Sequence, residues 1–316
     1  MAVYTDVSFE DLETFLGRYR LGAPLSFKGI AEGVENSNFY LRTEEGAFIL
    51  TLYEKRVQAR DLPFFLGLME HLSAQGIACP LPVRQSGGEL FGELNGRPAA
   101  LLTFLNGVSL RHPDADHCAA AGAALAALHE AGSGFALQRS NALGPKGWRD
   151  LAARAADGAD DVEQGLGDLI LTALDLPWPD GLPSGVIHAD LFPDNVLFMN
   201  GRVSGVIDFY FACNDAFAYD LAVLLNAWCF GADGGFDIVR SAKLFAAYRR
   251  HRALSATEID AMPALARGAA LRFLLTRLYD ILHHDPTALV RPKDPRDFAR
   301  RLRFHLSVKN PSEYGL

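Results

Sequence analysis

The sequence predicts an α+β protein with two lobes, the first built around an antiparallel sheet and the second mainly helical. Between residues 25 and 53, short runs rich in aromatic and β-branched residues are broken by glycines, which is typical of a meander of antiparallel strands. After Pro113 the apolar residues recur at helical spacing instead. We therefore expect an N-terminal lobe of residues 1–105 and a C-terminal lobe of residues 106–316.

Composition fits a globular protein with a large core. The chain has 316 residues, of which 49% are hydrophobic and 22% are charged. Its formal net charge of −8 argues against non-specific nucleic-acid binding, which depends on Lys and Arg neutralising phosphates. The four cysteines are widely spaced and form no C-x-x-C pair, so we expect reduced thiols packed as small hydrophobes: Cys79, Cys118, Cys213 and Cys229.

Neither a leader nor a membrane span is expected. Acidic residues from Asp6 to Asp11 interrupt the first segment, so it lacks the apolar region of a signal peptide. The longest apolar stretch, residues 217–230, contains Asp220 and Asn226 and is too short to span a bilayer. Both observations predict a cytoplasmic protein.

The elements of the first lobe follow from local signals. Ser8 begins a helix that continues to Gly22, because apolar residues recur there at helical spacing. A second helix is expected over residues 61–75, ending at Gly76. Asn95-Gly96 then joins two strand-like runs, 90–94 and 98–104, which is the strongest short hairpin signal.

The second lobe should contain several helices around one buried helix. An Ala-rich helix is expected over 115–131, and residues 148–176 should continue as helix. Residues 215–230 are apolar on nearly all sides, as suits a helix at the centre of a lobe. A further amphipathic helix is expected over 271–282.

The segment from Val186 to Tyr210 carries the chemistry. Two short apolar runs flank loops that hold Asp190, Asn195 and Asp208. Phosphoryl transfer needs a carboxylate to accept the proton of the attacking hydroxyl, and oxygen ligands that hold Mg²⁺ against the phosphates. The spacing D-x-x-x-x-N with an Asp after the next strand matches the kinase catalytic loop and metal turn. We therefore predict Asp190 as the base and Asn195 and Asp208 as metal ligands.

Several further segments extend this match. Together with the catalytic loop, the sequence resembles the aminoglycoside phosphotransferase superfamily, which shares the protein-kinase-like fold, and within it the bacterial homoserine kinases. The resemblance rests on LPFFLGLMEHL (62–72), LLTFLNG (101–107), HADLFPDNVLF (188–198), DFYFACND (208–215) and YDLAVLLNAWCF (219–230). It implies an enzyme that uses ATP and Mg²⁺ to phosphorylate the side-chain hydroxyl of L-homoserine, a step of threonine biosynthesis.

The resemblance also implies where ATP binds in the first lobe. The turn from Gly33 to Phe39 should cover the phosphates, with main-chain N–H groups as donors. Residues 103–105 should lie at the hinge and read the adenine through their main chain. The implied ATP-binding residues are Gly33, Asn36, Ser37, Asn38, Thr51, Thr103 and Leu105.

One position departs from the kinase pattern. Thr51 stands where kinases carry the strand lysine that pairs with the phosphates. The positive charge would then come from elsewhere, with Lys28, Arg42 and Lys55 nearby in the sequence, or the Thr51 hydroxyl and the metal would take its place. Glu70, which would pair with that lysine, is then expected to be solvated.

The remaining site residues concern the acceptor and the support of the loop. Homoserine is a zwitterion, so its carboxylate needs a cation or N–H groups, and its ammonium needs carboxylates or carbonyls. Residues between 140 and 180 should contribute to the acceptor site. The candidate substrate-binding residues are Tyr210, Asn214, Asp215 and Arg272. In relatives the His of the loop and the Asp of Y-D-L-A are structural, so we expect His188 and Asp220 to support the catalytic loop.

Two alternatives remain open from the sequence. Another kinase of the superfamily would act on an aminoglycoside, choline or a sugar derivative. A nucleotide-binding regulatory protein without catalysis would explain Thr51, but such a protein has no chemical use for Asp190, Asn195 and Asp208 together. The sequence does not indicate an oligomeric state.

Overall fold

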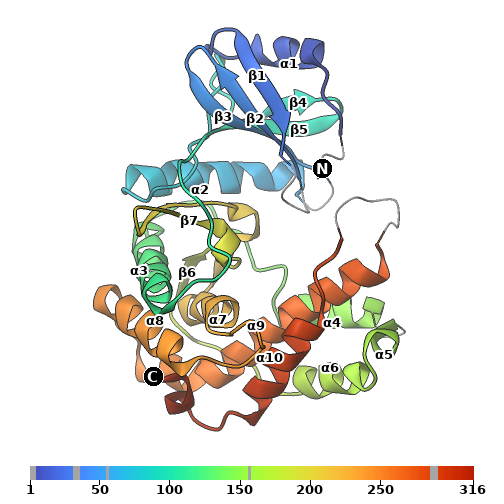
Figure 1. Cartoon of the computed structure of the whole chain (residues 1–316), viewed down its shortest axis with the longest axis vertical. Coiled ribbons are helices and arrows are strands. Elements are labelled where there is room, and N and C mark those ends of the chain that lie inside the picture. Colours follow the sequence, from blue (N-terminus) through green and yellow to red (C-terminus); the bar gives the residue numbers. More distant parts are fainter. Residues whose placement is uncertain (1–4, 31–35, 55–56, 156–157, 285–290) are drawn as a thin grey trace. The chain divides into compact units, whose positions relative to one another are not determined.

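The computed structural model describes residues 5–30, 36–54, 57–155, 158–284 and 291–316. The chain forms two compact units, the first made of Met1–Asn106 and Thr287–Arg291 and the second of Gly107–Pro286 and Pro292–Leu316 (Figure 1). An antiparallel sheet dominates the first unit and helices dominate the second, so the predicted α+β class is confirmed. None of the helices within the described ranges combines the length and apolar character needed to cross a membrane.

The first unit is a five-stranded sheet with two helices. The strand order is β1-β2-β3-β5-β4, and each neighbouring pair is antiparallel. The strands are β1 (Pro24–Gly29), β2 (Ser37–Thr43), β3 (Gly46–Leu52), β4 (Gly92–Leu94) and β5 (Arg97–Thr103). Asn95 and Gly96 both have positive φ, as a two-residue hairpin between β4 and β5 requires.

Helix α1 (Phe9–Leu16) covers part of this sheet. Ser8 and Asp11 form a capping box that satisfies main-chain donors at its first turn. Its inward face of Leu12, Phe15 and Leu16 joins one hydrophobic cluster with apolar residues of the strands. The helix is shorter than predicted: it ends at Leu16, and Gly17 is its C-cap residue. Helix α2 (Leu62–Ala74) matches the expected range closely.

The second unit contains two small antiparallel ribbons among helices. Strand β6 (Ser184–Ile187) pairs with β9 (Cys213–Ala216), and β7 (Val196–Met199) pairs with β8 (Arg202–Val206). Helix α7 contacts both strands of the ribbon formed by β6 and β9. The helices are α3 (Ala115–Ala131), α4 (Pro145–Ala155), α5 (Ala159–Val162), α6 (Leu166–Leu174), α7 (Phe217–Trp228), α8 (Ile238–His251), α9 (Ala256–Leu282) and α10 (Arg296–Ser307).

Helix α7 is the centre of this unit, as the sequence predicted. All but two of its side chains are buried, and α3, α8 and α9 contact it. Helices α3 and α8 approach closely at Gly122, where a Cβ atom would lie 2.5 Å from the Leu244 carbonyl oxygen. All four cysteines are buried and free, which confirms the predicted packing of the thiols.

The expectation of one continuous helix over residues 148–176 was wrong. Helix α4 ends at Ala155, α5 has only four residues, and α6 begins at Leu166. Gly158 precedes α5, and Gly165 precedes α6 with a φ of 80°. Glycine adopts this left-handed conformation without steric cost, so the chain changes direction where a continuous helix could not.

Candidate active site

The two ribbons bring the predicted catalytic residues together. Residues 188–195 connect β6 to β7, and Asp208 follows β8. Because β7 pairs with β8, the main-chain N–H of Ile207 donates to the carbonyl of Asn195 at 3.0 Å. Sheet register therefore places Asn195 next to the turn that carries Asp208.

Asp190 and Asn195 are in direct contact. Asn195 Nδ2 donates to the main-chain oxygen of Asp190 at 2.8 Å and to its carboxylate at 3.2 Å. Burial raises the pKa of Asp190 well above its ordinary value. The positive charge of Arg272 lowers this pKa and the negative charge of Asp208 raises it. Taken as a whole residue, Asp190 is partly exposed.

Asp208 adopts a strained backbone conformation. Its φ is 66°, in the left-handed region that non-glycine residues rarely occupy. Burial raises its pKa to about 6, although a hydrogen bond from the main-chain N–H of Tyr210 acts in the opposite direction. Left-handed residues of this kind are concentrated at functional sites, where the surrounding structure holds them in place.

His188 joins the catalytic loop to the metal turn. Its Nδ1 accepts the main-chain N–H of Asp190 at 3.2 Å, and Nε2 lies 3.0 Å from the Ile207 carbonyl oxygen. This pattern requires the proton on Nε2, so the ring is neutral. Burial lowers the pKa of His188, which agrees with the neutral form. The side chain is fully buried and makes contacts of a structural kind.

Asp220 on α7 holds the backbone of the loop from the other side. Its carboxylate accepts the main-chain N–H groups of His188 at 2.7 Å and Ala189 at 2.8 Å. His129 on α3 also lies 3.1 Å from it. Burial tends to raise the pKa of Asp220, but these hydrogen bonds outweigh burial and leave the pKa lowered.

The role of His129 could not be read from the sequence. Its Nδ1 lies 2.8 Å from the hydroxyl of Tyr248 on α8, so the ring bridges α8 and α7 inside the unit. Sequence position near a helix end suggested only an interaction with the helix dipole. A buried histidine in an otherwise Ala-rich helix was the only available signal, since its partners are about 90 to 120 residues away.

Of the predicted acceptor residues, Asn214 and Asp215 lie within β9. Asn214 accepts the Arg139 main-chain N–H at 2.8 Å, and Asp215 accepts the Asn141 amide at 2.7 Å. Tyr210 lies two residues after Asp208 and is partly exposed. Arg272, by contrast, is 1% exposed and donates to the carbonyl of Ala189, so its guanidinium lies inside the unit.

The predicted ATP-binding residues all belong to the first unit. Gly33 lies outside the described residues. Asn36 and Ser37 are buried, and the Ser37 hydroxyl donates to Glu54 at 2.6 Å. Asn38 accepts a hydrogen bond from the Thr51 hydroxyl at 2.8 Å. The described side chains after the turn thus stabilise the sheet.

The expected hinge residues differ in their main-chain contacts. The N–H of Thr103 already donates to the Leu81 carbonyl at 2.9 Å, and its hydroxyl accepts the Leu81 N–H at the same distance. Leu105 makes no main-chain hydrogen bond to the described residues. Of the two, Leu105 has the freer main-chain groups for an adenine ring.

Thr51 and Glu70, which occupy the positions of the kinase lysine–glutamate pair, have other partners in this structure. Thr51 is buried and hydrogen-bonded within the sheet. Glu70 was expected to be solvated, but this was wrong, because Arg84 binds it through two contacts of 2.9 and 2.6 Å. Lys28 and Arg42 are exposed, and Lys55 lies outside the described residues.

A different cation lies beside the catalytic loop. Lys293 Nζ is 3.1 Å from Asp194, which belongs to the loop between Asp190 and Asn195. The same Nζ is 5.8 Å from the centre of the Phe192 ring. Its positive charge also lowers the pKa of Asp190 and of Asp208. The contact of Lys293 with the loop was not predicted, because about 100 residues separate the two in the sequence.

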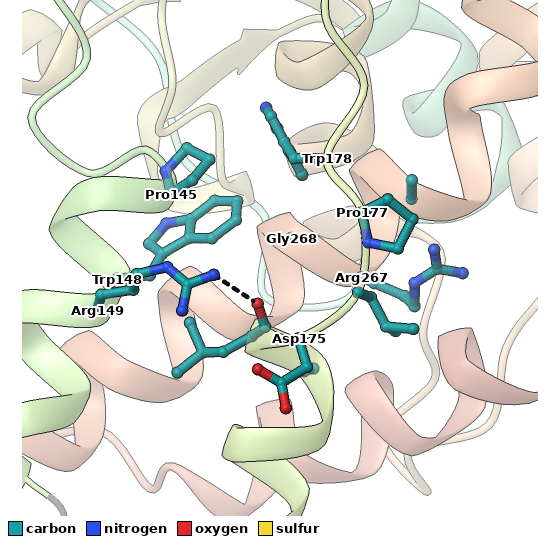
Figure 2. Close-up of a pocket in the computed structure, with 12 residues that line it drawn as sticks. Pro145, Trp148, Arg149, Asp175, Pro177, Trp178, Arg267 and Gly268 are labelled. Carbon is teal, nitrogen blue, oxygen red and sulfur yellow. Dashed lines mark hydrogen bonds between the residues drawn. The ribbon is translucent and has the colours of Figure 1, made fainter.

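Figure 2 shows a cavity of about 310 Å³ between α4, the end of α6 and α9. Trp148 and Trp178 form an aromatic wall, and a Cβ on Gly268 would lie 2.1 Å from Trp178. Both indoles also contact Tyr219, the neighbour of Asp220. Arg149 donates to the Leu174 carbonyl at the cavity's edge (Figure 2).

The carboxylate of Asp190 contacts the amide of Asn195, and Asn195 lies next to the turn that carries Asp208. The buried Asp220 supports the backbone of this loop. Together with the two-unit fold, this arrangement defines a kinase-type phosphotransferase. Residues 26–254 match the model of the phosphotransferase enzyme family, and the chain belongs to that family.

The curated relatives of the chain share one name within this family. The homoserine kinases of Parvibaculum lavamentivorans and Rhizobium johnstonii are each 57% identical to it over 319 aligned residues, covering 100% of this chain and 99% of theirs. The homoserine kinase of Methylobacterium radiotolerans is 59% identical with the same coverage.

Solved structures show the same fold at low sequence identity. A spectinomycin phosphotransferase in complex with ADP and spectinomycin has a TM-score of 0.69 and 14% identity, and the match covers 98% of each chain. An amicoumacin kinase in complex with AMP-PNP and Ca²⁺ has a TM-score of 0.67 and 14% identity, covering 98% of this chain and 93% of that one.

Proposed function

We propose that this protein transfers the γ-phosphoryl group of ATP to the side-chain hydroxyl of L-homoserine, giving O-phosphohomoserine and ADP. The observation that carries this proposal is the identity of more than half of all residues, over the full chain, with homoserine kinases. The contact between Asp190 and Asn195 supports it, because the chain keeps the groups that the chemistry needs. The reaction belongs to threonine biosynthesis, and we propose the cytoplasm as its location.

In this proposal, Asp190 orients the homoserine hydroxyl and accepts its proton as the oxygen attacks the γ-phosphorus. The residue is partly exposed, and Asn195 and the neighbouring loop fix the position of its carboxylate. Burial favours the uncharged product state of the carboxylate, which makes it a more effective proton acceptor. The bond from the γ-phosphorus to the β,γ-bridging oxygen breaks, and ADP leaves with that oxygen.

The donor atoms around the site fit a magnesium ion. Asn195 donates hydrogen bonds from Nδ2 to Asp190, and its Oδ1 accepts no hydrogen bond from the described residues. The Asp208 carboxylate supplies further oxygen ligands. Oxygen donors of this kind suit a hard cation. When bound, Mg²⁺ neutralises phosphate charge and orients the triphosphate, and Asn195 and Asp208 would hold it.

We further propose that Lys293 supplies positive charge that the strand lysine provides in other kinases. It forms an ion pair with Asp194 of the catalytic loop, whereas Lys28 and Arg42 belong to strands of the first unit's sheet. A cation near the transferring group stabilises the charge that develops there. This role differs from that of the strand lysine, which binds the α- and β-phosphates.

In this proposal, the two units bind different substrates. The first unit binds ATP through the turn containing Gly33, Asn36, Ser37 and Asn38, through Thr51, and through the hinge residues Thr103 and Leu105. The second unit carries Asp190 and binds the acceptor. Asp215 would bind the homoserine ammonium, while Asn214 and Tyr210 would complete the acceptor site.

An acceptor panel tests the proposal. Release of ADP is measured with homoserine, serine, choline, methylthioribose and kanamycin, each with Mg²⁺ and ATP. We expect homoserine to give by far the largest kcat/KM, and phosphohomoserine to appear in equal amount with ADP. Turnover of kanamycin, choline or methylthioribose in preference to homoserine would contradict the substrate assignment while leaving the enzyme class intact.

A further inference from the structure

Arg272 of α9 is a buried cation whose surroundings do not resemble an ion pair. Its side chain is 1% exposed, and Nη1 donates to the main-chain carbonyl of Ala189. The rings of Phe211 and Phe273 lie 5.2 and 4.4 Å from its guanidinium carbon. Nε is buried without a hydrogen-bond partner, and no carboxylate among the described residues forms an ion pair with it.

The carbonyl that Arg272 binds belongs to a strained part of the catalytic loop. Ala189 has a φ of 64°, which is costly for a residue with a Cβ atom. Its carbonyl and the N–H of Asp190 form one peptide group. Arg272 binds the oxygen of that group, and His188 Nδ1 accepts its N–H at 3.2 Å.

The preceding peptide group is fixed as well, because Asp220 accepts the Ala189 N–H at 2.8 Å. Two consecutive peptide groups before Asp190 are therefore held by buried side chains from α7, α9 and the loop itself. Their orientations determine where the Cα–Cβ bond of Asp190 points. A displacement of about 1 Å at a reacting group can reduce catalysis by about 100-fold.

A buried guanidinium without an ion pair is costly, and an apolar side chain would fill the same space without that desolvation cost. We propose that Arg272 is a positioning residue: by binding the Ala189 carbonyl it holds the left-handed backbone that orients the base Asp190. This inference rests on the proposed function of Asp190. It differs from the earlier expectation that Arg272 binds the acceptor carboxylate, for which a 1% exposed side chain offers no surface.

The two roles predict different kinetics. A positioning residue acts on the chemical step, so its loss lowers kcat and leaves the KM of the acceptor nearly unchanged. A carboxylate-binding residue affects homoserine but not L-homoserinol, the amino diol in which the carboxylate is replaced by an alcohol. Both acceptors are therefore assayed with wild type, Arg272→Met and Arg272→Lys.

Arg301 of α10 provides a matched control. Its guanidinium also lies over two phenylalanine rings, at 5.1 and 4.5 Å, and Nη1 donates to a main-chain carbonyl at 2.6 Å. That carbonyl belongs to Asn226 in the last turn of α7 and not to the catalytic loop. Arg301→Met thus reproduces the loss of a stacked, carbonyl-bound arginine without removing a hydrogen bond to the catalytic loop.

We expect Arg272→Met to lower kcat by about 100-fold on homoserine and homoserinol alike, with KM for homoserine within about 2-fold of wild type. Arg272→Lys keeps a donor and should recover part of kcat. If Arg272→Met does not fold, Arg272→Lys alone tests the inference. Arg301→Met should keep a kcat near that of wild type, and thermal unfolding of each variant reports the loss of stability separately.

Three outcomes would overturn the inference. One is a raised KM for homoserine with an unchanged kcat and unaffected homoserinol turnover, which would assign Arg272 to the carboxylate. Another is an equal loss of kcat in Arg301→Met, and the third is no loss in either Arg272 variant. If wild type phosphorylates another alcohol instead of homoserine, the proposed function fails, and the same kcat comparison on that alcohol still tests Arg272.

Discussion

The imidazole Nε2 of His129 lies 3.1 Å from the carboxylate of Asp220, and both side chains are completely buried. Asp220 accepts two main-chain N–H groups of the catalytic loop, and His129 is in turn bound to Tyr248. The loop is therefore anchored to α3 and α8 through one carboxylate of α7. Its geometry depends on the packing of the whole second unit.

Replacing Asp220 with Asn should weaken both stability and catalysis. The amide has one acceptor oxygen and would present its NH₂ group to one of the present donors. We expect the free energy of unfolding to fall by about 1–3 kcal/mol. Urea unfolding measures this change, and kcat should fall with little effect on the KM for ATP. An unchanged kcat in a correctly folded Asp220→Asn would argue against the anchoring role.

Asp190→Asn should nearly abolish turnover, because the amide cannot accept the hydroxyl proton. General base catalysis contributes about 10²- to 10⁴-fold, so we expect a loss of kcat in this range. ATP affinity, measured by calorimetry, should stay close to that of wild type. Asp168→Asn, an exposed position in the first turn of α6, serves as the control. Comparable rates for Asp190→Asn and wild type would exclude Asp190 as the base.

Asn195→Ala and Asp208→Asn should weaken binding of Mg²⁺ rather than of the acceptor. Loss even of groups that only support metal ligands reduces affinity by about 10- to 100-fold. We expect at least this increase in the Mg²⁺ concentration for half-maximal rate, with the KM for homoserine nearly constant at saturating Mg²⁺. A chelator should stop wild-type turnover, and added Mg²⁺ should restore it. Half-maximal Mg²⁺ concentrations equal to wild type would contradict the ligand assignment.

Lys293→Ala should lower kcat, while Lys293→Arg should preserve most of it because the positive charge remains. We expect a loss of about 10- to 100-fold for the alanine variant, less than for a fully buried donor because Lys293 is half exposed. Lys243 offers a matched control, since it forms a similar exposed ion pair with Asp116 at 2.6 Å. A kcat of Lys293→Ala no lower than that of Lys243→Ala would exclude this source of charge.

His305 should make stability depend on pH. Its pKa is lowered to about 3 by burial, whereas the unfolded value is about 6.5. The unfolded chain therefore binds one more proton between these values, so this contribution to stability is fully present above about pH 6.5 and is lost towards pH 3. The slope reaches about 1.4 kcal/mol per pH unit. His305→Gln should unfold with a shallower pH dependence, measured by urea titration at several pH values. An identical slope in both proteins would refute this.

The catalytic loop was predictable because its signal is local. Asp190, Asn195 and Asp208 occur within 19 residues, between strands β6 and β9. Hydrophobic patterning identified α3 and α7, and Asn95-Gly96 identified the hairpin of β4 and β5. Glycine conformation is less visible in a sequence, so the breaks at Gly158 and Gly165 were missed.

Apart from His188 and Asp220, the residues that support the loop were not assigned this role from the sequence, for a different reason. His129, Arg272 and Lys293 reach the loop from about 60 to 100 residues away. Nothing in the spacing of a single sequence indicates which distant helix faces meet. Arg84 binds Glu70 in the segment that follows α2, where Pro82 and Val83 pair with β5.

Tyr314 is completely buried, and its hydroxyl lies 2.8 Å from His305 while its carbonyl accepts the hydroxyl proton of Ser241 on α8. During synthesis, α7 and α8 leave the ribosome well before this residue does. Domains generally fold as they are synthesised, from the N-terminal side. The helices that anchor the catalytic loop must therefore wait, with one side of their core uncovered, until translation has passed residue 314.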